Sequence, residues 1–135
     1  MSRGPEAAFW KKVRRAWSGH SVRVEASDGE VDAGTPDTVL SVGYKGGFVE
    51  LKVWPDNVSS IQLAWHQDAI ERGAYCMVLS ELPDGDVWLG NAEDYDALIR
   101  ACSFSRNAKL IADKTKRGKR SLHDALKVIR CALIG

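Results

Sequence analysis

The sequence contains few cysteines, and their arrangement excludes two kinds of site. Cys76, Cys102 and Cys131 are odd in number and widely spaced, which fits neither a disulfide framework nor a four-ligand zinc site. We therefore expect buried thiols. Residues 1–10 also lack the apolar run of a signal peptide or a transmembrane helix. These absences predict a cytosolic protein.

The sequence also has almost no net charge. Nineteen Lys and Arg residues against 18 Asp and Glu give a formal charge of +1, so no global attraction to nucleic acid is expected. The basic residues are nevertheless clustered, and a cluster can contact phosphates or simply form a solvated face. The two clusters are Lys11, Lys12, Arg14 and Arg15, and then Lys109, Lys114, Lys116, Arg117, Lys119 and Arg120.

The length and the residue patterns predict one α/β domain. A chain of 135 residues with 44% apolar and 27% charged residues is an ordinary globular domain. Apolar spacing, capping residues and turn signals predict an αβββαβ core over about residues 5–90 and a helical addition over about 91–135. A mixed central sheet with helices on both faces follows. The expected helices are 5–17, 59–72, 91–100 and 121–133, and the expected strands are 22–26, 37–42, 48–54, 75–79 and an edge strand at 87–89.

One predicted strand carries charge where apolar residues are expected. Glu50 and Lys52 are two residues apart and point to the same face, whereas Val49, Leu51 and Val53 point to the other. Burying a carboxylate and an ammonium on a central strand is costly unless they pair with each other or hold a metal ion. Both a structural ion pair and an active site fit this pattern.

Asp37 favours the active site. It begins the preceding hairpin arm, directly after the turn-forming residues Gly34 to Pro36. A turn centred on Lys45 and Gly46 would place Asp37 opposite Trp54, so a bulge or a wider turn is expected to bring it to Glu50. Two carboxylates and a lysine would then supply Mg²⁺ ligands and a cation for phosphodiester hydrolysis.

These residues resemble a known family. Pro36-Asp37 followed by Phe48-Val49-Glu50-Leu51-Lys52 resembles the signature of the PD-(D/E)xK nuclease superfamily, which has a restriction-endonuclease-like fold. With Gln62, Trp65-His66 and Gly73-Ala74-Tyr75, the stretch is most similar to the virus-type VRR-NUC branch and to archaeal-type Holliday junction resolvases. The resemblance covers about residues 5 to 80.

The resemblance implies a site and a cofactor. It implies Mg²⁺, with Mn²⁺ as a substitute, held by Asp37, Glu50 and the Leu51 backbone carbonyl, and Lys52 as the catalytic cation. Glu6 or Glu25 would complete the site; Glu6 shares the inward face of the first helix but could instead interact with the helix dipole. Gln62 would lie near the metal as well as capping its helix. The expected DNA contacts are Lys45, His66 and eight of the clustered basic residues. These eight are Lys11, Lys12, Arg14, Arg15, Lys116, Arg117, Lys119 and Arg120.

The expected function is a structure-specific DNA endonuclease. The chain contains no separate DNA-reading module, which favours recognition of DNA shape over sequence. The resemblance implies a homodimer that cuts branched DNA such as Holliday junctions, located in the host cytoplasm if the protein is viral. Two alternatives stay open: a VRR-NUC-like nuclease acting on flaps, single strands or nicked duplex, and a non-catalytic nucleic-acid binding module on the same fold.

Overall fold

The computed structural model describes residues 4–23, 34–102 and 107–135 of the chain. Five helices and six strands occur in these ranges. In chain order they are α1 (Pro5–Ala16), β1 (His20–Arg23), β2 (Thr38–Val42), β3 (Lys45–Val53), α2 (Ser60–Glu71), β4 (Cys76–Glu81), β5 (Val87–Gly90), α3 (Ala92–Cys102), α4 (Ala108–Thr115), β6 (Lys119–Arg120) and α5 (Leu122–Ile134).

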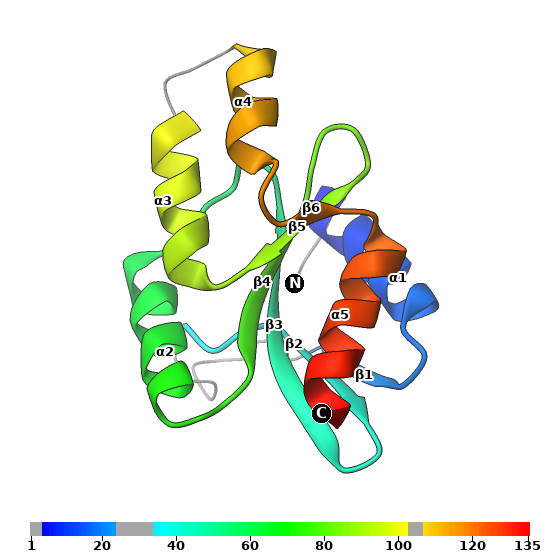
Figure 1. Ribbon diagram of the computed structural model, residues 1–135. Helices are drawn as coiled ribbons and strands as arrows, with labels where there is room; N and C mark the ends of the chain where they lie inside the picture. The colour runs from blue at the N-terminus through cyan, green and yellow to red at the C-terminus, as the bar shows by residue number, and fades with distance from the viewer. Residues whose placement is uncertain (1–3, 24–33, 103–106) are drawn as a thin grey trace.

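The strands form one mixed sheet in the order β1-β2-β3-β4-β5-β6. Only β3 and β4 pair in parallel, and every other neighbouring pair is antiparallel. Helices α1 and α5 cover one face, while α2, α3 and α4 lie on the other (Figure 1). The predicted α/β fold with a mixed sheet flanked by helices is confirmed. No helix in the described ranges is long and apolar enough to cross a membrane.

The sheet separates two apolar cores. Beneath α1 and α5, Phe9, Val13 and Ile129 pack on Val49 and Leu51 of β3. The second core, between the sheet and α2 and α3, contains Val58, Val78, Leu82, Trp88, Ala92, Tyr95 and Ile99. Because side chains alternate along β3, the residues between Val49, Leu51 and Val53 face α2. Glu50 and Lys52 therefore lie on the α2 face.

Local signals set several helix boundaries as predicted. The Ser59 side chain accepts from the Gln62 backbone, and the Gln62 side chain accepts from the Ser59 backbone, which completes the capping box of α2. Asn91 accepts from the backbone N–H of Asp94 at the start of α3. Ser121 caps α5 in the same way. These boundaries depend on short-range hydrogen bonds, which a sequence pattern records directly.

The hairpin turn differs from the predicted one. Val42 pairs with Lys45, so the turn contains only Gly43 and Tyr44, and β3 begins at Lys45. Gly43 adopts φ 59, a backbone conformation that glycine tolerates. Gly47 lies in the strand, paired with Leu40, and glycine fits there because a Cβ would meet the Tyr75 ring at 2.6 Å. The glycine run therefore allows close packing on the strand and does not widen the turn.

Other corrections concern the ends of the sheet. β1 spans His20–Arg23; Val24 to Ala26, also predicted as strand, lie outside the described residues. The alternation of Val22, Val24 and Ala26 with Arg23 and Glu25 predicts Val22 inside and Arg23 outside, but Val22 is 57% exposed and the Arg23 side chain only 9%. β5 is not an edge strand, because β6 pairs with it. Cys76 and Cys102 are buried as expected, but Cys131 is exposed.

Candidate active site

The hairpin register brings Asp37 to Glu50. Thr38 pairs with Val49, so the next position in the same register places Asp37 opposite Glu50. Neither a bulge nor a wider turn is needed, which corrects that expectation. The Leu51 N–H donates to Asp37 Oδ1 at 3.3 Å, and the Thr38 hydroxyl donates to the same oxygen at 3.2 Å. The Asp37 carboxylate is thus fixed at the end of β2.

Pro36 shapes the backbone at this point. Pro36 precedes β2, which begins at Thr38, and the Leu51 N–H of β3 donates to the Asp37 side chain instead of to a strand carbonyl. Proline has no N–H, so it cannot donate to the Leu51 carbonyl as a strand partner normally would. The carbonyl and the N–H of one residue point toward the same neighbouring strand, which turns this carbonyl toward Asp37. Its predicted role as a metal ligand stays a prediction.

Glu50 is the buried acid of the site. It is 3% exposed, and Gln62 Nε2 donates to its Oε1 at 2.8 Å. Burial, followed by the charge of Asp37 and a hydrogen bond with it, raises the pKa of Glu50 to about 9, although Lys52 opposes the shift. Without a cation, the two facing carboxylates therefore favour holding a proton on Glu50. A divalent cation between them would remove that requirement.

Lys52 lies beside the acids and is oriented by Gln62. Its Nζ donates to Gln62 Oε1 at 3.3 Å, and its side chain is 11% exposed. The Asp56 carboxylate lies 4.0 Å from the same nitrogen. Gln62 contacts Ser59, Glu50 and Lys52 at once. Both interpretations of Gln62, as a helix cap and as a residue at the site, agree with these contacts.

Arg23 lies in the site although sequence reasoning placed it on the outside of its strand. Its guanidinium donates to Glu6 Oε1 at 2.8 Å, lies 3.5 Å from Asp37 Oδ2 and lies over the Trp10 ring with 5.8 Å to the centroid. Alternation in β1 gave the wrong orientation, because a charged side chain turns inward when carboxylates meet it there. Glu25 lies outside the described residues.

Glu6 reaches the site from the first turn of α1. Burial, and then the Asp37 carboxylate, raise the pKa of Glu6, whereas Arg23 and Lys52 lower it. Its carboxylate is bound by Arg23 in this structure, so its metal-binding role stays a prediction. In the described ranges, no three His, Cys, Asp or Glu side chains are gathered so as to hold a metal ion.

Two carboxylates and a carbonyl suit Mg²⁺ nevertheless. Mg²⁺ is commonly bound through one or two carboxylates, with water and substrate phosphate oxygens completing its octahedral shell. Asp37, Glu50 and the Leu51 carbonyl supply hard oxygen donors of this kind. Burial and the Asp37 carboxylate raise the pKa of Glu50, and a bound cation would favour its ionised form. The donor set therefore fits the ion that the sequence implied.

No family model matches the sequence, and no curated protein matches it. Among solved structures, this chain is similar to that of Archaeoglobus fulgidus Hjc, a Holliday junction resolvase from an archaeal hyperthermophile. The TM-score is 0.48 at 20% sequence identity, and the match covers 66% of this chain and 75% of that chain. The residues of the candidate site are therefore assigned from their own geometry.

His66 does not face solvent, which corrects its prediction as a DNA contact. It is fully buried, and its Nδ1 lies 3.1 Å from Cys76 Sγ. Burial, and then the charge of Lys52, lower the pKa of His66 to about 4. His66 Nε2 is buried without a hydrogen-bond partner among the described residues. The imidazole is thus a neutral core group behind the site.

The buried imidazole predicts acid sensitivity. Unfolded His66 protonates near its ordinary pKa of 6.5, and folded His66 near 4, so the unfolded state binds more protons between these values. Stability should fall as pH drops from 6.5 to 4, by roughly 3 kcal/mol from this group. Urea unfolding of wild type and His66→Gln across this range measures it. A stability difference between the two proteins that does not change with pH would contradict the prediction.

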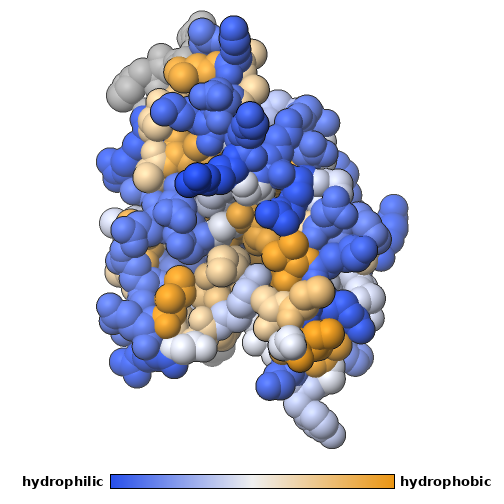
Figure 2. All heavy atoms as spheres, in the orientation of Figure 1, coloured by the Kyte–Doolittle hydropathy of each residue, from blue (hydrophilic) through white to orange (hydrophobic). Residues whose placement is uncertain are grey.

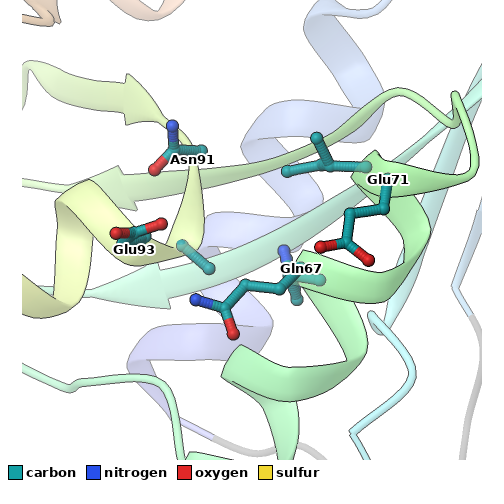
Figure 3. A pocket seen from close by; sticks show the side chains of 7 residues that line it. Gln67, Glu71, Asn91 and Glu93 are labelled. Carbon is teal, nitrogen blue, oxygen red and sulfur yellow. The ribbon is translucent and has the colours of Figure 1, made fainter.

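A pocket of about 390 Å³ lies next to His66, between α2 and α3. Gln67 and Glu71 of α2 lie across it from Asn91 and Glu93 at the start of α3 (Figure 3). Asp37, Glu50 and Lys52 do not line it. The four pocket residues labelled in Figure 3 are amides or acids, and none of them carries a basic group that could bind a phosphate. The pocket is therefore separate from the candidate active site.

The basic residues predicted to contact DNA have different surroundings. Lys11 and Arg15 are exposed on α1, Lys45 is exposed beside the hairpin turn, and Lys116 and Arg117 are exposed after α4. Lys12 pairs with Glu81 at 2.8 Å, and Arg14 lies over Trp10. Lys119 is bound by Asp84 and lies 3.9 Å from Asp86, and Arg120 is half-buried in β6. Two acids therefore offset the charge of Lys119.

Proposed function

We propose that the protein is a metal-dependent nuclease of the PD-(D/E)xK type with a restriction-endonuclease-like fold. The observation that carries the proposal is the hairpin register, which sets Asp37 opposite Glu50 and places Lys52 on the same face. The nuclease core spans about residues 5–90. The C-terminal addition, about 91–135, contributes β6 to the sheet and α5 to the core under α1.

Each side chain has a role that its surroundings support. Mg²⁺ held by Asp37, Glu50 and the Leu51 carbonyl would supply positive charge for the phosphate and lower the pKa of bound water. Lys52, oriented by Gln62, stabilises the charge that develops on the phosphate as the attacking water adds. Gln62 also keeps Glu50 turned toward Asp37.

Arg23 balances the negative charge at the same place. Its two ion pairs join Glu6 and Asp37. A guanidinium is permanently charged and donates in a planar fork, so it keeps its orientation when the carboxylates change protonation. We assign to Arg23 the positioning of both acids.

The proposed substrate is branched DNA such as a Holliday junction, cut by a homodimer. Symmetric cleavage of a four-way junction needs two active sites, and one chain carries one. Flaps, single strands and nicked duplex, the substrates of a VRR-NUC-like nuclease, are the second candidate because the same three residues would cut them. A non-catalytic binding module is the third, and the intact set of acids and lysine argues against it.

The decisive experiment measures cleavage of end-labelled DNA by wild type and Asp37→Asn. The substrates are a four-way junction, a flap, a single strand and a linear duplex, each with Mg²⁺, Mn²⁺ or EDTA. We expect Mg²⁺-dependent paired nicks across the junction that disappear in the variant. Thr38→Val, which removes one hydrogen bond to Asp37 and keeps its carboxylate, is the matched control and should retain cleavage.

The other outcomes discriminate between the alternatives. Preferential cutting of flaps or single strands would assign the VRR-NUC-like role. Tight binding without cleavage of any substrate, under every metal condition, would leave only the binding module. Equal cleavage by wild type and Asp37→Asn would contradict the assignment of Asp37, Glu50 and Lys52 as the active site.

A further inference from the structure

Several segments of the sequence carry no acidic residue, and three of them lie close together in the fold. These three are residues 10–23, 38–49 and 125–135, and all 18 Asp and Glu residues lie outside them. The same segments contain eight basic residues: Lys11, Lys12, Arg14, Arg15, Arg23, Lys45, Lys127 and Arg130. Acids from other segments pair with two of the eight, Lys12 and Arg23, and the remaining six still give a local excess of positive charge.

The fold brings these three segments together. α1 and α5 pack on the same face of the sheet, where Phe9, Val13 and Ile129 share one core. β1 pairs with β2, and the Trp17 indole donates to the carbonyls of His20 and Ser41. Arg130 donates to Ser18 at 2.6 Å, which joins α5 to the end of α1. We call the surface formed by α1, β1, the β2–β3 hairpin and the end of α5 the basic track.

The basic track starts at the candidate active site and leads away from it. Glu6, in the first turn of α1, contacts Arg23 at the end of β1, and both belong to the site. From there α1 runs toward the hairpin, as the contacts of Trp17 with His20 and Ser41 require. Twelve helical residues span about 18 Å, which matches roughly five base pairs of duplex. The α1 side of the molecule is largely hydrophilic (Figure 2).

Tyr44 lies at the end of the basic track that is farther from the candidate active site. It occupies the second position of the two-residue turn, and its exposure of 107% means that the ring packs against nothing in the described residues. Glu50 lies six positions further along the chain, a rise of about 20 Å along the strand. The residue next to Tyr44 is the exposed Lys45. An aromatic ring beside a cation is the pair that proteins use to stack on an unpaired base and hold its phosphate.

We propose that the basic track binds the nucleic-acid arm next to the cut site, and that Tyr44 stacks on an unpaired base where that arm ends. The proposal deepens the proposed function by naming the substrate as DNA with a branch or a single-stranded end about 20 Å from the scissile phosphate. The C-terminal cluster is the competing surface, in which Asp84 and Asp86 offset the charge of Lys119 as Glu81 offsets that of Lys12 in the track.

The charge of the track is tested by binding without cleavage. The probe is a fluorescein-labelled splayed-arm duplex, titrated in EDTA at 50 to 200 mM salt. Lys11→Ala with Arg15→Ala is compared with Lys116→Ala with Arg117→Ala, because both pairs remove two exposed charges. The first pair should lower the slope of log affinity against log salt by about 1.8, and the second should leave it unchanged. A larger loss in the second pair would overturn the proposal.

Stacking by Tyr44 is tested with the same duplex carrying 2-aminopurine at the branch. Tyr44→Ala should weaken binding by roughly 5- to 150-fold and abolish the fluorescence change, while blunt duplex binds as before. Tyr44→Phe should restore both, because it keeps the ring. Equal binding of the splayed-arm probe by wild type and Tyr44→Ala would overturn the proposal.

The nuclease function and DNA binding by the basic track can be contradicted independently of each other. Binding in EDTA needs no catalysis, so a protein that binds through the track yet cuts nothing would contradict only the nuclease. Normal cleavage of branched DNA by the Tyr44→Ala and the Lys11→Ala with Arg15→Ala variants would contradict only the track.

Discussion

Replacement of Lys52 by alanine is expected to reduce DNA cleavage on the order of 10³-fold while binding stays within about twofold of wild type. The ammonium is held by Gln62 beside Glu50 and has little contact with solvent, so its charge acts where the phosphate would react. Losing one preorganised charge in such a site costs catalysis far more than affinity. Single-turnover cleavage at saturating enzyme, together with binding in EDTA, measures the two quantities.

A lysine away from the site provides the control. Lys109→Ala removes an exposed charge from the first turn of α4 and should cleave like wild type. Both variants should show the far-UV circular dichroism of wild type. A Lys52→Ala protein that cleaves within tenfold of wild type would contradict the assigned role.

In EDTA, wild type is expected to lose stability between pH 5 and pH 9, by several kcal/mol relative to Glu50→Gln. The folded protein holds a proton on Glu50 up to about pH 9, whereas the unfolded chain releases it near 4.5. The folded state therefore binds more protons across this window, and stability falls as pH rises. Urea unfolding of both proteins at a series of pH values measures the difference.

Mg²⁺ should reverse this loss in wild type only. An ion bound between Asp37 and Glu50 stabilises the ionised pair and binds the folded state in preference to the unfolded chain. Glu50→Gln lacks one of the two carboxylates and should show little stabilisation at the same Mg²⁺ concentration. If Mg²⁺ stabilises both proteins equally at pH 8, the ion binds elsewhere.

Short-range sequence patterns predict many of the helices and strands. The α2 capping box at Ser59 and Gln62, the Asn91 cap of α3 and the apolar spacing of α1 all act within a few residues. Such signals do not depend on distant parts of the chain, so they predicted these elements correctly. Two elements were missed: the helix α4 (Ala108–Thr115), and the two-residue strand β6, which exists only through pairing with β5.

The candidate residues Asp37, Glu50 and Lys52 could also be predicted from the sequence, because two charged residues with a common face on an apolar strand are conspicuous. The position of Asp37 opposite Glu50 could not be predicted in the same way. A shift of the turn from Lys45-Gly46 to Gly43-Tyr44 moves the partner of Asp37 from Trp54 to Glu50. Packing of Tyr75 and Leu133 against Gly47 holds that glycine in the strand, and neither residue is near it in sequence.

The sequence by itself determined most of the element types, the polarity of β3 and the candidate residues for a metal ion. Tertiary structure alone decided that Arg23 turns inward, that His66 is buried and that three acid-free segments form one surface. The physical reason is the range of the interactions. Propensity, capping and alternation act over a few residues, whereas ion pairs, burial and charge accumulation depend on which segments the folded chain places side by side.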